Sequence, residues 1–381
     1  MLVVSALFFE IALNLPVGSM PLALTQDGAS RAAVAVAMGC GMFAALFGSL
    51  PIGALTDRIG RLATIRGAAL VGTLSMLGLA FAHGALLGGA LLALRSIAVV
   101  AYMTAEFAYA SELASKDRAV SGVATLGMIG NLTFATAPAL GVFLWQHGVG
   151  REQYLWSAAL AAAGLGCMFL LPKRHDVRLA STRRAPLFMH PRWLPAVGFA
   201  ASATLQGGVN GSLAILTFHD RGIANGALIF TASAAVSFLL RYPAGRLVDR
   251  FGPRAIAVPV AIVQGAGCVL AAEAHSVAAV LLAGACLGFA WSAVVPVALG
   301  LLFEHSTSNT RGAAMGAYSL AFSGGAALGA VVATLSTLAG AGYPLAIVIC
   351  AIAPLLALPA VVRSRRSTRA MTLRAAVTTS S

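Results

Sequence analysis

The chain has 381 residues, of which 59% are hydrophobic and 10% are charged, and its formal net charge is +13. Water-soluble domains are about 45–50% apolar and about 25% charged, so this composition excludes an ordinary soluble globular protein. Repeated apolar runs of roughly 20 residues, the length that crosses a bilayer, instead indicate an integral membrane protein.

Charges, prolines and glycines divide the sequence into twelve apolar segments, six in each half. In the first half we expect helices at 2–25, 32–55, 67–82, 85–110, 119–145 and 153–171. In the second half we expect helices at 193–218, 226–246, 255–272, 277–303, 312–338 and 343–362. Because the first run has no basic leader and no small-residue cleavage site, we expect it to be retained rather than removed as a signal peptide.

The prediction is therefore an all-α integral membrane protein with twelve transmembrane helices in two six-helix bundles. The bundles are expected at 1–171 and 193–362, with a basic linker at 172–192 and a basic tail at 363–381.

The basic residues alternate between the two sides of the expected membrane. If the N-terminus is cytoplasmic, twenty of the 25 Lys and Arg residues lie in cytoplasmic segments, and the outer loops hold only Arg31, Arg151 and Arg221. This asymmetry follows the positive-inside rule and predicts that both termini are cytoplasmic. We expect a bacterial cytoplasmic (inner) membrane protein, and the same distribution argues against nucleic acid as the partner of the basic linker.

The cysteines and histidines do not form a metal or redox motif. The five cysteines fall inside expected helices without a C-x-x-C pair, and the seven histidines are scattered. This pattern indicates cysteines that pack as small apolar residues and not a disulfide or metal framework. No G-x-x-x-x-G-K-[ST] stretch is present. We therefore expect neither a metal nor a cofactor. We also expect the protein to be a monomer in the lipid bilayer.

Two short stretches repeat after the second helix of each half. They read PIGALTDRIGR at 51–61 and PAGRLVDRFGP at 243–253, and a constant shift of 192 residues superimposes them. The matched positions are Gly53 with Gly245, Asp57 with Asp249, Arg58 with Arg250, and Gly60 with Gly252. The shift spans an even number of helices, so the two halves enter the membrane in the same direction, as in parallel transporter repeats.

The repeated pattern G-x-L-x-D-R-x-G-R/P resembles the signature loop of the major facilitator superfamily. With twelve helices, the resemblance covers nearly the whole chain and implies secondary transport by alternating access. It also implies a cytoplasmic gate at Gly53, Asp57, Arg58, Gly60, Arg61, Gly245, Asp249, Arg250 and Gly252.

In the superfamily, the first loop meets the start of the eleventh helix, near residues 311–316, when the cavity faces outward. The contact breaks when the cavity opens inward, and Asp249 would pair in the same way with the start of the fifth helix. Each aspartate is expected at a helix N-terminus, where the dipole favours an anion. The alternative is that these charges only end the helices and follow the positive-inside rule.

Three ionisable side chains inside the expected helices are candidates for proton coupling: Glu10, Arg95 and Glu106. Such groups are costly in a bilayer and are functional candidates by default. Arg95 also resembles the superfamily's fourth-helix arginine. The alternatives are interhelical hydrogen bonds for either carboxyl and exposure near the inner rim for Glu106. Arg241 is expected to snorkel to the interface.

The fifth helix carries Pro138 and Gly141, which resemble the G-P-x-x-G-G element of the superfamily's antiporters. We expect them to pack closely against the other half. Polar and aromatic side chains expected to line a central cavity are Asn14, Tyr102, Asn131, Gln206, Asn210, Gln264, Trp291 and Tyr318. Alternatively, each of these side chains only forms a hydrogen bond between packed helices.

The leading functional hypothesis is proton-driven export of a small organic molecule. The first alternative is proton-coupled uptake of a metabolite. A membrane enzyme is disfavoured, because no catalytic cluster gathers at one membrane face. A transport-inactive sensor is the remaining alternative.

Overall fold

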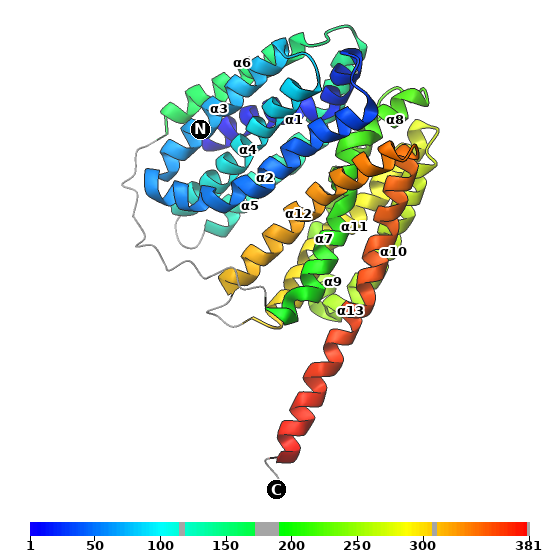
Figure 1. The fold of residues 1–381 in the computed structure, drawn as a ribbon. Helices are drawn as coiled ribbons and strands as arrows, with labels where there is room; N and C mark the ends of the chain where they lie inside the picture. The colour runs from blue at the N-terminus through cyan, green and yellow to red at the C-terminus, as the bar shows by residue number, and fades with distance from the viewer. Residues whose placement is uncertain (114–118, 172–189, 307–310, 379–381) are drawn as a thin grey trace.

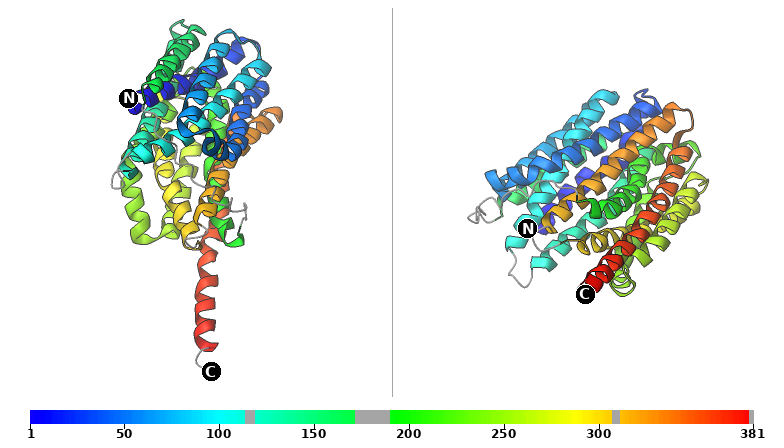
Figure 2. Two further views of the ribbon diagram at one scale, coloured as in Figure 1. Left: turned by 90° about the vertical axis from the view of Figure 1, so that its left-hand side faces the viewer. Right: turned by 60° about the horizontal axis from the view of Figure 1, so that its bottom comes forward.

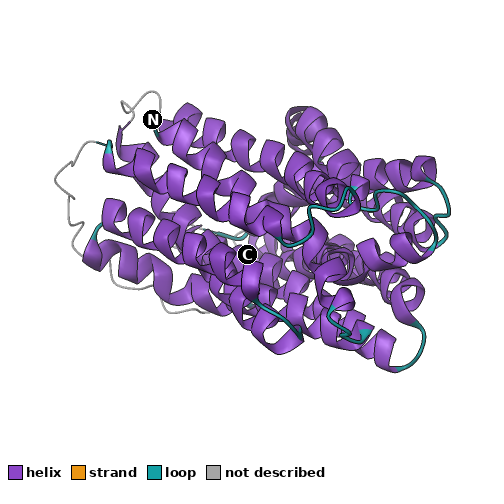
Figure 3. Ribbon diagram, turned by 90° about the horizontal axis from the view of Figure 1, so that it is seen from above, coloured by secondary structure: helices purple, strands orange, loops and turns teal. Residues whose placement is uncertain are grey.

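The computed structural model describes residues 1–113, 119–171, 190–306 and 311–378. All regular structure within these ranges is helical (Figures 1 and 3). Ten of the described helices are long and apolar enough to cross a membrane. The predicted all-helical membrane fold is confirmed.

The N-terminal half contains α1 (Leu2–Gln26), α2 (Arg31–Ile59), α3 (Arg61–Phe81), α4 (Ala85–Leu113), α5 (Ala119–Gln146) and α6 (Glu152–Phe169). The C-terminal half begins with η1 (Pro191–Trp193) and the continuous run of α7 (Leu194–Val209), η2 (Asn210–Ala214) and α8 (Ile215–Asp220). It continues with α9 (Leu228–Phe251), α10 (Pro253–Ala272), α11 (Val277–Phe303), α12 (Arg311–Leu338) and α13 (Gly342–Thr378). Counting α7 to α8 as one span, each half has six. The two sets occupy different parts of the molecule in Figures 1 and 2.

The helices run between two faces, which we name by their residues. The N-terminal face carries Met1, Gly60 and Gly252, and the opposite face carries the turns after α1 and α8. Because the spans alternate in direction, every second connection lies on the same face. If the positive-inside prediction holds, the N-terminal face is cytoplasmic.

Helices α2 and α3 are joined by Gly60 alone, and α9 and α10 by Gly252 alone. These glycines have φ of 93° and 82°, a region that favours glycine and allows a one-residue turn. The longer loops expected after residues 55 and 246 are therefore wrong. The expected placement of the two aspartates at a helix N-terminus is also wrong. Asp57 and Asp249 lie in the last turns of α2 and α9.

Helix α13 continues far beyond the expected end of the last span at residue 362. It reaches Thr378, and its final turns project away from both bundles (Figure 1). Residues 363–378 include five Arg and three Ala, which are good helix formers even outside a membrane. The expected basic tail is thus mainly a helical extension.

An ionic cluster at the opposite face ties together four helices of the N-terminal half. Asp27, just after α1, accepts hydrogen bonds from the Gly84 N–H (2.7 Å) and from Arg151 (2.5 Å), and its other oxygen lies 3.2 Å from His83 Nδ1. Arg151 also donates to the Ala82 carbonyl. Burial alone would raise the pKa of Asp27, but these hydrogen bonds and the Arg151 charge hold it below its ordinary value.

We expect Asp27→Ala to lower the free energy of unfolding by about 3 kcal/mol, because it leaves Arg151 half-buried without its carboxylate. Denaturation in detergent micelles at neutral pH measures this. The control is Asp220→Ala, whose ion pair with Arg31 is exposed and is worth at most about 1 kcal/mol. Since the pKa of Asp27 is lowered, its contribution is complete at neutral pH and is lost only as the pH falls below the usual aspartate range. Equal effects of the two substitutions would contradict this assignment.

Polar contacts join the two halves near the opposite face. Arg31 of α2 pairs with Asp220 of α8, and Gln146 at the end of α5 donates to a carbonyl in the turn before α9. Deeper in the molecule, Asn225 donates to the Ala139 carbonyl at 2.9 Å. These contacts close the interface between the halves on that side.

Candidate functional site

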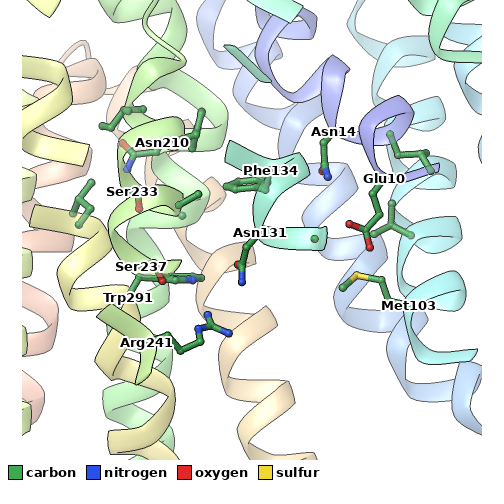
Figure 4. A pocket seen from close by; sticks show the side chains of 18 of the residues that line it. Glu10, Asn14, Met103, Asn131, Phe134, Asn210, Ser233, Ser237, Arg241 and Trp291 are labelled. Atoms are coloured by element: carbon green, nitrogen blue, oxygen red, sulfur yellow. The ribbon is translucent and has the colours of Figure 1, made fainter. Parts of the chain in front are cut away.

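A cavity of about 490 Å³ lies between the two halves (Figure 4). Its N-terminal wall comes from α1, α4 and α5, and its C-terminal wall from α7, η2, α9 and α11. The wall includes the aromatic side chains Phe9, Tyr102, Phe107, Phe134, Phe230 and Trp291. Its polar side chains include Glu10, Asn14, Asn131, Gln206, Asn210 and Ser233. The cavity is mainly apolar with a few polar groups, as small-molecule sites usually are.

Two of the residues that we expected at the cavity lie elsewhere. Tyr318 is not among the residues that line the cavity, and its ring centroid lies 5.8 Å from that of Phe322, which in turn lies 5.1 Å from that of Trp291. Gln264 is buried and donates to the Ala203 carbonyl at 2.9 Å, which links α10 to α7. For Gln264 the packing alternative is the right one.

Glu10 lies in α1 at the cavity wall and is only 6% exposed. Its Oε2 accepts a hydrogen bond from Thr133 of α5 at 3.0 Å, and Asn14 donates to the same hydroxyl at 3.3 Å. A side chain at Gly130 would stand 3.2 Å from Oε2, so the glycine makes room for the carboxyl. Within the described residues, the buried Oε1 has no hydrogen-bond partner.

Glu106 is fully buried, so the alternative of exposure at an inner rim is wrong. Its Oε1 accepts a hydrogen bond from Tyr102 at 3.3 Å, and within the described residues its buried Oε2 has no hydrogen-bond partner. Tyr102 stands between this carboxyl and the cavity, with its ring 4.1 Å from that of Phe9. Glu106 therefore lies one side chain behind the wall.

Arg95 does not line the cavity. Its Nε donates to the backbone carbonyl of Leu13 at 2.5 Å, which ties α4 to α1 between Glu10 and Asn14. The structure thus gives Arg95 a contact that positions the helix of Glu10.

The seventh span is continuous but changes from α- to π-helix where it borders the cavity. A π-helical turn occupies Asn210–Ala214, and such turns are frequent at functional sites. Asn210 donates to Gln206 at 2.8 Å and accepts from the buried hydroxyl of Tyr343 at 2.7 Å. The glycine-rich stretch QGGVNGS at 206–212 was the sign in the sequence that the helix is irregular here.

A polar stripe on α9 was missed in the sequence. Ser233, Ser237 and Arg241 are spaced by four residues and all line the cavity (Figure 4). Arg241, which we expected to snorkel to the interface, has its exposed side chain on the cavity wall. The four-residue spacing of these side chains places them on one helix face, and it could have revealed the stripe in the sequence.

The Major Facilitator Superfamily profile matches residues 2–219 and, a second time, residues 196–378. The chain belongs to the major facilitator superfamily. Its fold and family make it a transporter rather than an enzyme. A search of curated proteins found no match.

Solved structures of other transporters share the fold at low sequence identity. The nucleoside transporter NupG has a TM-score of 0.79 with 14% identity, over 95% of this chain and 97% of that chain. A POT family transporter in complex with 5-aminolevulinic acid has a TM-score of 0.76 with 13% identity, over 96% of each chain. A bacterial homolog of the human lysosomal transporter Spinster, in an inward-facing and occupied conformation, has a TM-score of 0.77 with 14% identity, over 96% of this chain and 95% of that chain.

The gate residues of this superfamily member are placed only in part. Asp249 and Arg250 are exposed at the N-terminal face, and Arg58 is exposed at the end of α2. The side chain of Asp57, and those at 111–125 and 311–313 that include expected partners of the two loops, lie outside the described residues. Arg254 forms an ion pair with Glu304 at 2.6 Å inside the C-terminal half.

Pro138 and Gly141 of this transporter pack against α1 of their own half. An added side chain at Gly141 would lie 2.4 Å from the Leu15 carbonyl, and one at Gly18 would lie 2.0 Å from the Pro138 carbonyl. The expected contact with the other half is wrong for these two residues. Other positions of α5 contact the C-terminal half, since the Ala135 and Ala139 carbonyls accept hydrogen bonds from it.

We expect Gly141→Ala to destabilise the protein by about 1–3 kcal/mol, because the new methyl group overlaps backbone that has little freedom to move. Thermal unfolding in detergent measures the effect. Gly166→Ala in α6 is the matched control, since an added side chain there meets nothing within 4 Å. If the two variants melt alike, the close α1–α5 contact is not needed.

Proposed function

We propose that this protein is a proton-coupled secondary transporter that moves a small organic molecule through the cavity between its two halves. The observation that carries the proposal is Glu10, a buried carboxyl on the cavity wall with one oxygen unpartnered among the described residues. Ionisable groups inside membrane spans commonly mark proton pathways.

The proposed coupling follows from the cost of burying a charge. A carboxylate that loses its water without a cation partner is strongly disfavoured, and binding a proton removes the charge. In this proposal Glu10 takes up a proton when the cavity closes around it and releases the proton when water returns. Thr133 and Asn14 hold the carboxyl at the wall, and Arg95 holds the backbone of α1.

The proposed cycle alternates the access of the cavity between the two faces. The contacts at Arg31–Asp220 and Asn225–Ala139 close one side. The proposed gate at Asp57 and Asp249 closes the other side in the second state. In this proposal the structure, with contacts between the halves near its opposite face, corresponds to the inward-facing state if the N-terminal face is cytoplasmic.

Export is the proposed direction, and it rests on the resemblance of Pro138 and Gly141 to the antiporter element. Uptake is the alternative. The membrane potential supplies about 2.3 kcal/mol per charge per 100 mV in either case.

The test begins with a growth screen of expressing cells against drugs and metabolites, including nucleosides and 5-aminolevulinic acid, the compounds named for two structural relatives. A hit is then measured as flux in proteoliposomes with an imposed pH gradient. The proposal predicts gradient-driven accumulation, and vesicles that accumulate the solute when acidified inside identify export. If the reconstituted protein moves no compound of the panel, a transport-inactive sensor becomes the better account.

A further inference from the structure

Arg241 is a cation on the cavity wall that has no role in the proposed proton coupling. It lies ten residues before Phe251, the last residue of α9. That distance is roughly 15 Å along the helix, and the side chain of Arg241 is exposed. In Figure 4 it points into the cavity from below Trp291 and Asn131.

This cation has no carboxylate partner among the described residues. The charged side chains on the described cavity wall are Arg241 and Glu10, which stand on different halves and apart in Figure 4. The described ion pairs do not include Arg241, whereas Arg31, Arg151 and Arg254 each have one. When Glu10 carries a proton, this part of the cavity therefore holds one uncompensated positive charge.

A second polar group beside Arg241 also lacks a partner. Ser237, one turn away on the same stripe, is only 2% exposed, and its hydroxyl is buried without a hydrogen bond among the described residues. Unpaired buried hydroxyls are unusual, because leaving them unsatisfied costs free energy. Ser237 therefore offers an unused hydrogen-bonding group one turn from Arg241 on the cavity wall.

We infer that the substrate carries a carboxylate, which binds Arg241 and Ser237 while its apolar or aromatic body packs on Trp291, Phe134 and Phe230. A guanidinium matches a planar carboxylate with two parallel hydrogen bonds. A single cation balances a single negative charge, whereas a phosphate monoester carries about −1.5 to −2. This inference rests on the proposed function, since it names the substrate class of the same cavity.

The test uses matched acids and amides as probes: benzoate with benzamide, and indole-3-acetate with indole-3-acetamide. Binding to the purified full chain is measured by calorimetry. We expect each acid to bind at least about tenfold more tightly than its amide, because a hydrogen bond to a charged group is the stronger kind. We expect Arg241→Gln to remove this preference and Arg241→Lys to keep part of it, because lysine retains the charge but not the planar fork.

Arg246→Gln is the matched control, because Arg246 lies on the same helix but stacks on Tyr242 outside the cavity. It should keep the full preference, and melting curves show whether each variant is folded. Amides that bind as well as acids, a preference that survives Arg241→Gln, or no binding of any probe would each overturn the inference.

Failure of the inference and failure of the proposed function give different results. If Glu10-dependent transport of an uncharged solute is found, the carboxylate inference fails and the proposed function stands. If acids bind through Arg241 but neither they nor other solutes are transported, the site stands and the proposed function fails.

Discussion

Glu10→Gln is expected to lower gradient-driven accumulation of substrate at least about tenfold while leaving substrate binding and downhill exchange in place. Glutamine keeps the shape of the side chain and still accepts the hydrogen bond from Thr133, but it cannot exchange a proton. The loss should therefore appear only when transport depends on a proton gradient.

The measurement is solute flux in proteoliposomes with and without an imposed pH gradient. Glu273→Gln is the control, because this glutamate is exposed at the opposite face after α10. Should Glu10→Gln still concentrate solute in response to the gradient, Glu10 is structural. Glu106, behind Tyr102, would then be the carboxyl to test.

Asp57→Asn is expected to cut the transport rate at least about tenfold with little change in expression or thermal stability. The proposed reason is that Asp57 forms the gate contact that closes the N-terminal face, so its loss affects a step of the cycle and not the packing of the bundle. The rate per folded protein in proteoliposomes measures this effect.

Asp249→Asn, at the equivalent position, is the comparison variant. It should be milder, because the second copy has Pro253 where the first has Arg61 and therefore lacks one of the gate cations. Normal transport by Asp57→Asn would contradict the proposed gate, and greater damage from Asp249→Asn would contradict the asymmetry.

The number of spans and the repeat were readable in the sequence because both depend on composition and on a fixed spacing. Segment length and apolar content predict a membrane helix without any knowledge of its neighbours. The equivalent turns at Gly60 and Gly252 likewise agree with the shift of 192 residues. The length of those turns was not readable, since charged residues at a membrane interface continue a helix as readily as they end it.

The cavity wall was only partly predictable, because it depends on how each helix is rotated against its neighbours. Glu10 and Asn14 are one turn apart and share a wall, which spacing alone suggests. Tyr318 and Gln264 were misplaced because sequence does not show which face meets another helix. Arg241 was assigned to the interface on the basis of charge, although the serine spacing before it marked a single face.

The ionic cluster at Asp27 and Arg151 was missed for a related reason. The two residues are far apart in the sequence, and each sits in a short turn that carries no motif. Only the packing of α1, α3 and α6 brings the turns together.

The most direct test of the central claim, that the two halves rock about the cavity under control of Glu10, is a pair of spin-label distances. After replacement of the five cysteines, labels at Ile59 and Phe251 report on the N-terminal face, and labels at His147 and His275 report on the opposite face. All four positions are exposed. In lipid nanodiscs at acid and alkaline pH, we predict two populations in which one distance lengthens as the other shortens, with a pH dependence that Glu10→Gln removes. Distances that stay at single values under all conditions, or that change together in the same direction, would contradict the account.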